Sequence, residues 1–139
     1  MSPLSDRLRE VVDALPLRPG LRVLEIGGAP GAAARVVAAR VAPSGHVLVL
    51  DRSARGISLT EKVCASEIAA GLVSTKLACV EDFTLDTEPF DLALACRVGA
   101  LDGRHPQLYE PAVECLRRVL VAPATLYVDT GSPLRAVIL

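Results

Sequence analysis

A strand, a glycine-rich turn and a helix follow one another without a break near the start of this sequence. Residues 21–26 are mostly apolar but carry Glu25, residues 27–31 contain three glycines, and residues 32–41 are rich in alanine. Glycine permits positive φ and removes the side chain that would keep a ligand away from the backbone. The first N–H groups of the following helix have no partner inside the helix. The unit therefore indicates a ligand-binding turn, although a tight turn without a ligand would use the same residues.

The same alternation of helix and strand continues along the sequence. Apolar periodicity predicts helices at residues 4–15, 32–41, 53–70 and 108–119, and strands at residues 21–26, 46–50, 77–80, 90–96 and 124–128. Such alternation is typical of an α/β fold, in which right-handed crossovers place helices on both faces of a parallel sheet. We expect one doubly wound, mostly parallel sheet of about five strands, with ligands bound at the carboxyl ends of its strands.

The composition fits a single domain covering residues 1–139. Hydrophobic residues make up 51% of the chain and charged residues 22%, which argues against disorder. The 15 basic and 16 acidic residues give a net charge of −1, which argues against nucleic acid as a partner. No apolar run reaches the roughly 20 residues of a membrane span, so we expect no membrane association.

The cysteines stand far apart in apolar stretches, at Cys64, Cys79, Cys96 and Cys115. Zinc sites usually draw ligands from closely spaced pairs, so this spacing predicts no metal site. Free cysteines of this kind are usually reduced core residues. The N-terminal segment carries charges and no apolar signal-peptide core. These features together predict a cytoplasmic protein.

Asp51 follows the second predicted strand and narrows the choice of ligand. A carboxylate at this place in a doubly wound fold accepts hydrogen bonds from the hydroxyls of a ribose. The alternative is that Asp51 only caps the helix that follows. Together with the glycine turn, Asp51 favours a nucleoside ligand.

The residues of the turn argue against a dinucleotide. Ala29 stands where the G-x-G-x-x-G pattern has its second glycine, and Pro30 lacks an N–H for a pyrophosphate. Glu25 adds a negative charge, which suits the sulfonium and amino group of S-adenosylmethionine better than a pyrophosphate. An NAD(P)-binding protein therefore remains only the second alternative.

At these residues the sequence resembles the class I S-adenosylmethionine-dependent methyltransferases, which have a Rossmann-like core. Residues 24–31 are similar to the family's acidic residue and G-x-G-x-G motif, residues 81–83 to its adenine-contacting stretch, and residues 90–96 to the strand that borders the methyl-transfer site. The resemblance implies that S-adenosylmethionine binds, with S-adenosylhomocysteine as product. The cofactor-binding residues it implies are Glu25, Gly27, Gly28, Ala29, Gly31, Asp51, Arg52, Glu81, Asp82, Phe83, Cys96 and Arg97.

Two departures from the family keep an alternative open. Ala29 replaces the middle glycine, and the predicted strands stop at five where the family has seven. The chain is therefore interpreted as a short form that lacks the C-terminal strand pair. A degenerate methyltransferase fold that acts as a binding or interaction module, without catalysis, is the first alternative to an enzyme.

The loop at residues 97–106 follows the fourth predicted strand and is expected to face the methyl acceptor. Its imidazole and its carboxylate, His105 and Asp102, are candidate general bases, and Arg97 and Arg104 are candidate ligands of an anionic acceptor. A polar surface loop is the alternative. The leading hypothesis is a methyltransferase that acts on an unidentified small-molecule acceptor.

The last predicted strand and the tail suggest an assembly. Without a further hairpin, residues 124–128 form an apolar sheet edge, and residues 135–139 are apolar and β-prone. Pairing of these segments across a two-fold axis would bury both, which predicts a homodimer through residues 124–139. The alternative is a tail that folds back over its own edge in a monomer.

Overall fold

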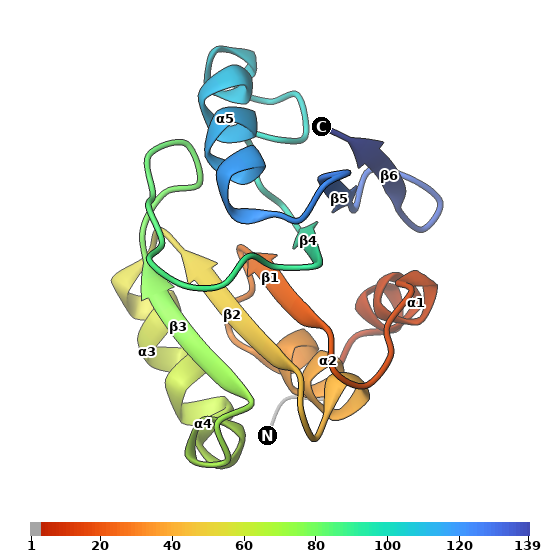
Figure 1. Cartoon of the computed structure of the whole chain (residues 1–139), viewed down its shortest axis with the longest axis vertical. Coiled ribbons are helices and arrows are strands. Elements are labelled where there is room, and N and C mark those ends of the chain that lie inside the picture. The colour runs from red at the N-terminus through yellow and green to blue at the C-terminus, as the bar shows by residue number, and fades with distance from the viewer. Residues whose placement is uncertain (1–3) are drawn as a thin grey trace.

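The computed structural model describes residues 4–139, which build one six-stranded sheet flanked by helices (Figure 1). The strand order is β3-β2-β1-β4-β5-β6; β1 to β5 run parallel, and β6 runs antiparallel to β5. In chain order the elements are α1 (Asp6–Ala14), β1 (Arg22–Ile26), α2 (Ala32–Val41), β2 (His46–Asp51), α3 (Ala54–Val63), α4 (Ala65–Ala69), β3 (Val73–Leu77), β4 (Leu92–Ala95), the 3-10 turn η1 (Pro106–Leu108), α5 (Tyr109–Val119), β5 (Thr125–Val128) and β6 (Arg135–Ile138). The expected α/β fold is confirmed, with one strand more than the sequence predicted.

The order of the strands fixes where a ligand can enter. The chain moves from β1 outward through β2 to β3, then returns to the other side of β1 as β4. The connections after β1 and β4 therefore leave the sheet in opposite directions and open a crevice at the carboxyl ends of these two strands.

The helices cover the two faces unequally. Helices α1, α2 and α3 pack on one face, where Val23, Val47 and Val49 meet the alanine-rich side of α2. Helix α5 covers the opposite face, together with the long connection between β3 and β4, and packs on Leu24 and Leu126. Figure 1 shows α5 over the β4–β5 side of the sheet and the connection crossing near β1 to β3.

Local sequence explains the central elements. Strands β1 and β2 are buried on both faces, as a parallel sheet between helix layers requires. The small residues of α2, such as Ala34 and Ala38, are fully buried, so this helix lies close against the sheet. Serines begin two of the helices: Ser5 Oγ accepts from the N–H of Leu8 at 3.2 Å, and Ser53 Oγ accepts from that of Gly56 at 3.0 Å.

Three predicted boundaries were wrong. The third strand is Val73–Leu77, before the predicted residues 77–80, because an edge strand with Ser, Thr and Lys lacks the apolar run that served as the signal. The helix predicted at residues 53–70 is divided at Cys64 into α3 and α4. The fourth strand is shorter than predicted, and Phe90 makes only an isolated bridge to Leu120.

The tail folds back within the chain. Strand β6 pairs with β5, with Leu126 opposite Val137 and Thr125 opposite Ile138. The β5 edge that was expected to be open is therefore covered, as in the alternative stated above. Pairing between two copies would have to use the outer edge of β6, and the homodimer stays a prediction.

Other features bear on the class of site. All four cysteines are free, and Cys79 alone among them is not buried. Within residues 4–139, no three His, Cys, Asp or Glu side chains gather in a way that would hold a metal ion. None of the helices in that range is long and apolar enough to cross a membrane.

Candidate nucleoside-binding site

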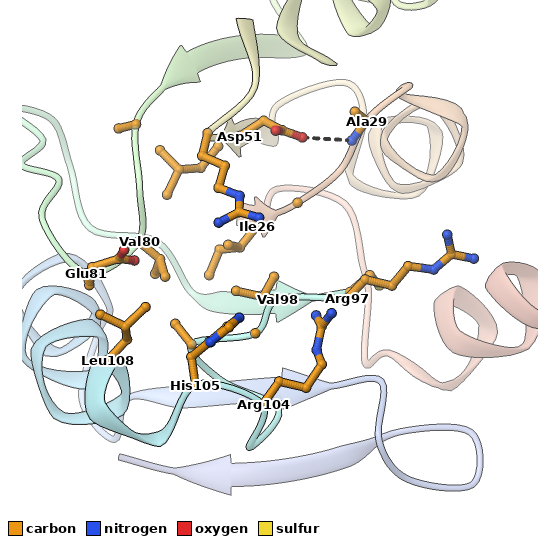
Figure 2. Close-up of a pocket in the computed structure, with 17 residues that line it drawn as sticks. Ile26, Ala29, Asp51, Val80, Glu81, Arg97, Val98, Arg104, His105 and Leu108 are labelled. Carbon is orange, nitrogen blue, oxygen red and sulfur yellow. Dashed lines mark hydrogen bonds between the residues drawn. The ribbon is translucent and has the colours of Figure 1, made fainter. Parts of the chain in front are cut away.

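A cavity of about 250 Å³ lies at the carboxyl ends of β1, β2 and β4. Figure 2 shows Ala29 and Asp51 on one side of it, Glu81 and Val80 on a second side, and Arg104 and His105 opposite Asp51. The residues that line the cavity are Ile26, Gly27, Ala29, Leu50, Asp51, Arg52, Ala78, Val80, Glu81, Cys96, Arg97, Val98, Gly99, Ala100, Arg104, His105 and Leu108. The cavity thus lies at the place where the strand order reverses.

The turn after β1 needs its glycines because neighbouring elements come close. Gly27 has φ +75°, and a Cβ there would lie 2.8 Å from the carbonyl oxygen of Cys96. Gly31 has φ +107°, and a Cβ there would lie 2.9 Å from Cys64 Sγ. Gly28 leaves room for the carboxyl group of Glu25. Gly27 therefore lets the ends of β1 and β4 approach each other beside the cavity.

Glu25 lies under the turn and not on the cavity wall. Glu25 is 1% exposed, and its Oε1 has no hydrogen-bond partner among residues 4–139. Burial raises the pKa of this carboxyl to about 8, because a charge without solvent or a partner is costly. Contact between Glu25 and a ligand stays a prediction.

Asp51 ties the turn to the end of β2. Its Oδ2 accepts from the N–H of Ala29 at 3.4 Å, and its Oδ1 accepts from the N–H of Ser53 at 2.9 Å. A Cβ added to Gly56 would lie 3.0 Å from Ala29 Cβ, so Gly56 leaves the space that the Ala29 methyl occupies. The replacement of the middle glycine is therefore matched by a glycine on α3.

The connection after β3 contributes a mixed wall. Val80 and Glu81 line the cavity, whereas Asp82 is exposed outside it. Phe83 is 3% exposed and belongs to the hydrophobic core beneath α5. The connection between β3 and β4 contains no helix, and Phe83 covers this part of the sheet instead.

Arg97 begins the loop after β4 in an unusual conformation. It is the one non-glycine residue among residues 4–139 with positive φ, +56°. Its N–H donates to Oδ2 of Asp129 at 3.2 Å, and the same oxygen accepts from Arg7 Nη2 at 3.2 Å. Asp129 is 6% exposed and follows β5 directly. Sequence reasoning missed Asp129, although an acidic residue at the end of a strand was the signal that singled out Asp51.

Asp102 does not line the cavity and is paired with Arg104. Arg104 Nε lies 2.9 Å from Asp102 Oδ2 and 3.0 Å from Oδ1, and Nη2 lies 2.9 Å from Oδ2. Burial acts to raise the pKa of the Asp102 carboxyl, but the hydrogen bonds and charge of Arg104 outweigh it and hold that pKa below its ordinary value. A carboxylate held in this way is a weaker proton acceptor, and the contact fixes the Arg104 guanidinium; a role of Asp102 as general base stays a prediction.

His105 and Cys96 complete the wall near the loop. The His105 ring lies against Gly99, where no side chain fits, and the His105 N–H donates to Gly99 O at 3.0 Å. Burial raises the pKa of the Cys96 thiol to about 12, so it is not a nucleophile at neutral pH. His105 is therefore the candidate base that the cavity retains.

The structure brings most of the predicted site residues to one cavity. Those on its wall are Gly27, Ala29, Asp51, Arg52, Glu81, Cys96, Arg97 and His105, and those away from it are Glu25, Gly28, Gly31, Asp82, Phe83 and Asp102. The sequence also did not single out three apolar wall residues, Val80, Val98 and Leu108.

Solved methyltransferases share this fold. An S-adenosylmethionine-dependent methyltransferase from Aquifex aeolicus is similar with a TM-score of 0.69, at 19% identity, over 87% of this chain and 62% of that chain. Phosphoethanolamine N-methyltransferase 1 from Haemonchus contortus, in complex with phosphoethanolamine and S-adenosylhomocysteine, has a TM-score of 0.69 at 19% identity, over 91% of this chain and 26% of that chain. The cyclase SpnF has a TM-score of 0.69 at 20% identity, over 87% of this chain and 42% of that chain.

These comparisons define the class of fold. The chain has the Rossmann-like fold of the class I S-adenosylmethionine-dependent methyltransferases, which confirms the predicted resemblance at the level of the fold. It spans between 26% and 62% of the length of the three structures named above. No protein-family model and no curated protein matches the sequence.

Proposed function

We propose that this chain binds S-adenosylmethionine and transfers its methyl group to a small-molecule acceptor in the cytoplasm. The observation that carries the proposal is the cavity itself, which has Asp51 and the glycine turn on one side and His105 on the other. The reacting groups of a nucleoside cofactor and an acceptor would meet between these sides. The methyltransferases among the structures with this fold support the same reaction class.

The chemistry of the wall fits a nucleoside. Each oxygen of Asp51 accepts one backbone N–H and keeps a lone pair for a ribose hydroxyl. Glu81 offers a second carboxylate, and Ile26, Val80 and Leu108 offer apolar surface for a base. Gly27 keeps the backbone of the turn free of a side chain beside the ligand.

The proposed mechanism rests mainly on positioning. S-adenosylmethionine supplies a methyl group on a sulfonium, whose sulfur leaves with the C–S bonding pair as a neutral thioether. The side chain of Asp51 orients the ribose, and the apolar side chains of Val98 and Leu108 exclude water from the loop side. His105 accepts the proton that an acceptor hydroxyl or amine loses as its lone pair bonds the methyl carbon.

The first alternative is a binding module without catalysis. SpnF has the same fold but is named as a cyclase, so the fold alone does not determine the reaction. Such a module would bind the cofactor and leave it unchanged. The second alternative, a dinucleotide-binding protein, is disfavoured because Pro30 has no N–H and that of Ala29 is directed at Asp51.

Calorimetry with three ligands separates a dinucleotide-binding protein from the other two functions, and a turnover assay separates the methyltransferase from a binding module. We expect S-adenosylmethionine and S-adenosylhomocysteine to bind saturably with one site per chain, and NAD to give no heat of binding. Binding of NAD alone, or of none of the three, would contradict the proposal. Turnover is then followed as release of S-adenosylhomocysteine with a panel of small acceptors. His105→Ala should lower that rate by about 100-fold or more and change the Kd of S-adenosylhomocysteine less than twofold.

A further inference from the structure

We propose that the methyl acceptor carries an oxyanion, a carboxylate or a phosphate, and that Arg104 binds it beside His105. This inference rests on the proposed function, because it assigns the acceptor half of the same cavity. It follows from how charge is distributed over the wall, how Arg104 is held, and which of its donors remain without a partner.

The carboxylates on the cavity wall lie away from the loop after β4. Both carboxylates, Asp51 and Glu81, lie on the sides formed by β2 and by the connection after β3. Arg52, next to Asp51, adds a cation on that side. The loop after β4 contributes no carboxylate to the wall; its basic wall residues are Arg97, Arg104 and His105. Figure 2 shows Arg104 and His105 rising together from this loop on the side opposite Asp51. An anion would therefore be attracted to the loop side.

Arg104 is held ready for a ligand. Asp102 binds Nε and Nη2, and the backbone N–H of Arg104 also donates to Asp102 Oδ1 at 3.2 Å. Asp102 is itself fixed, because its N–H donates to Val98 O at 3.0 Å. Gly103, with φ +93°, makes the tight turn that lets the guanidinium fold back onto Asp102. An arginine ordered in this way loses less conformational entropy when it binds an oxyanion.

The remaining guanidinium nitrogen provides the donors. In residues 4–139 no side chain or carbonyl pairs with Arg104 Nη1. Asp102 neutralises one charge, but the guanidinium groups of Arg52 and Arg97 have no ion-pair partner in the same part of the chain. A cationic sulfonium in the cavity would add a further positive charge. The bound cofactor and the loop together thus favour an acceptor with a negative charge.

The neighbouring apolar residues limit what the acceptor can be. Val98, Ala100 and Leu108 line the cavity, and Figure 2 shows Val98 and Leu108 beside His105, so the body of the acceptor meets apolar surface while its oxyanion reaches Arg104. The cavity of about 250 Å³ also has to hold the cofactor, so only a small group of the acceptor fits inside it. The nucleophile to be methylated would lie near His105, a few bonds from the oxyanion.

The test uses anions too small to be excluded by shape. Protein is first titrated with S-adenosylhomocysteine, and then acetate, its neutral isostere acetamide, and inorganic phosphate are titrated at constant ionic strength. Binding is followed by the NMR shifts of backbone amides in residues 97–105 and of the arginine side chains. We expect acetate or phosphate to saturate these shifts and acetamide to leave them unchanged; the tighter anion identifies the oxyanion class.

Variants locate the anion. Arg104→Gln should raise the Kd of the tighter anion by about 10- to 100-fold, the range for a hydrogen bond to a charged group, while S-adenosylhomocysteine binding stays within twofold. Arg117→Gln removes the same charge from α5, where Arg117 pairs with exposed Glu114 away from the cavity, and should change neither affinity. Equal anion affinity in Arg104→Gln and the parent protein, or no saturation by either anion, overturns the inference. If S-adenosylhomocysteine does not bind, only the proposed function is contradicted. The anions are then titrated into the protein alone, and that titration still tests the oxyanion site.

Discussion

The methyl group of Ala29 occupies space that Gly56 leaves open: a Cβ at Gly56 would lie only 3.0 Å from Ala29 Cβ and 3.3 Å from the Asp51 carboxyl. The turn after β1 and the first turns of α3 are thus fitted to each other. A methyl added at Gly56 would press on that of Ala29, and removal of the Ala29 methyl would make room for it.

The first prediction tests this fit by a double-mutant cycle. Gly56→Ala should weaken S-adenosylhomocysteine binding because the new methyl presses on both Ala29 and Asp51, even though alanine favours a helix by about 1 kcal/mol over glycine. Ala29→Gly alone should be tolerated. The double variant should recover most of the lost affinity in calorimetry. If the double variant binds no better than Gly56→Ala, the contact does not shape the site.

The second prediction concerns the ribose. Asp51→Ala should weaken S-adenosylhomocysteine binding by about 1.5–3 kcal/mol, or roughly 10- to 100-fold, because hydrogen bonds to a charged group are lost. Part of the loss comes through the turn, since Asp51 also accepts from the N–H of Ala29. Calorimetry gives the Kd, and circular dichroism checks the fold. An unchanged Kd in a folded variant would remove Asp51 from the site.

The central fold was predictable because its signals are local and strong. Strands β1 and β2 are buried on both faces, and such strands appear in the sequence as continuous apolar runs. Strand β3 lies at an edge, and its Ser74 and Lys76 carry no such signal. The apolar signal came from the residues after β3, because Ala78 and Val80 pack in the core that includes α5 and line the cavity.

The part of the candidate site formed by the loop after β4 depends on tertiary contacts that cannot be read from the sequence. The glycine turn follows β1 directly and Asp51 is the last residue of β2, so their place was predictable from the alternation. The pairing of Asp102 with Arg104 depends on the turn at Gly103, which bends the loop back on itself. Asp129 meets the Arg97 N–H across the carboxyl ends of two neighbouring strands, a relation that only the strand order creates.

The third prediction separates steric contact from backbone strain. Gly27 and Gly71 have nearly the same φ, +75° and +78°, but an added Cβ meets Cys96 O at 2.8 Å in the first case and nothing within 4 Å in the second. Gly71→Ala should cost about 1–2 kcal/mol of stability from strain alone. Gly27→Ala should cost clearly more and also abolish S-adenosylhomocysteine binding. Urea unfolding measures both, and equal losses would mean that the contact is relieved without cost.

The fourth prediction uses the buried carboxyl of Glu25. Burial raises its pKa from 4.5 to about 8, so the folded state keeps a proton that the unfolded state releases above the lower value. The resulting stability is complete below the unfolded pKa and is lost as the pH rises toward the folded pKa, with a slope of at most about 1.4 kcal/mol per pH unit. Glu25→Gln should flatten the pH dependence of the free energy of unfolding in that window. Glu114→Gln, on the exposed face of α5, is the control and should leave the slope as it is.

The last prediction concerns assembly through residues 124–139. Strand β6 now forms this edge of the sheet; its backbone is unpaired on the outer side within the described chain, and Ile138 is 65% exposed. An apolar edge of this kind favours pairing with a second copy, and a lysine on it opposes such pairing. Light scattering at micromolar concentration should therefore give the mass of two chains, and Ile138→Lys should reduce it to one while the circular dichroism spectrum stays that of a folded chain. Val137 packs against the core, so Val137→Lys should instead destabilise the fold itself. A one-chain mass for the parent protein would contradict the homodimer and leave β6 as a cover for β5 alone.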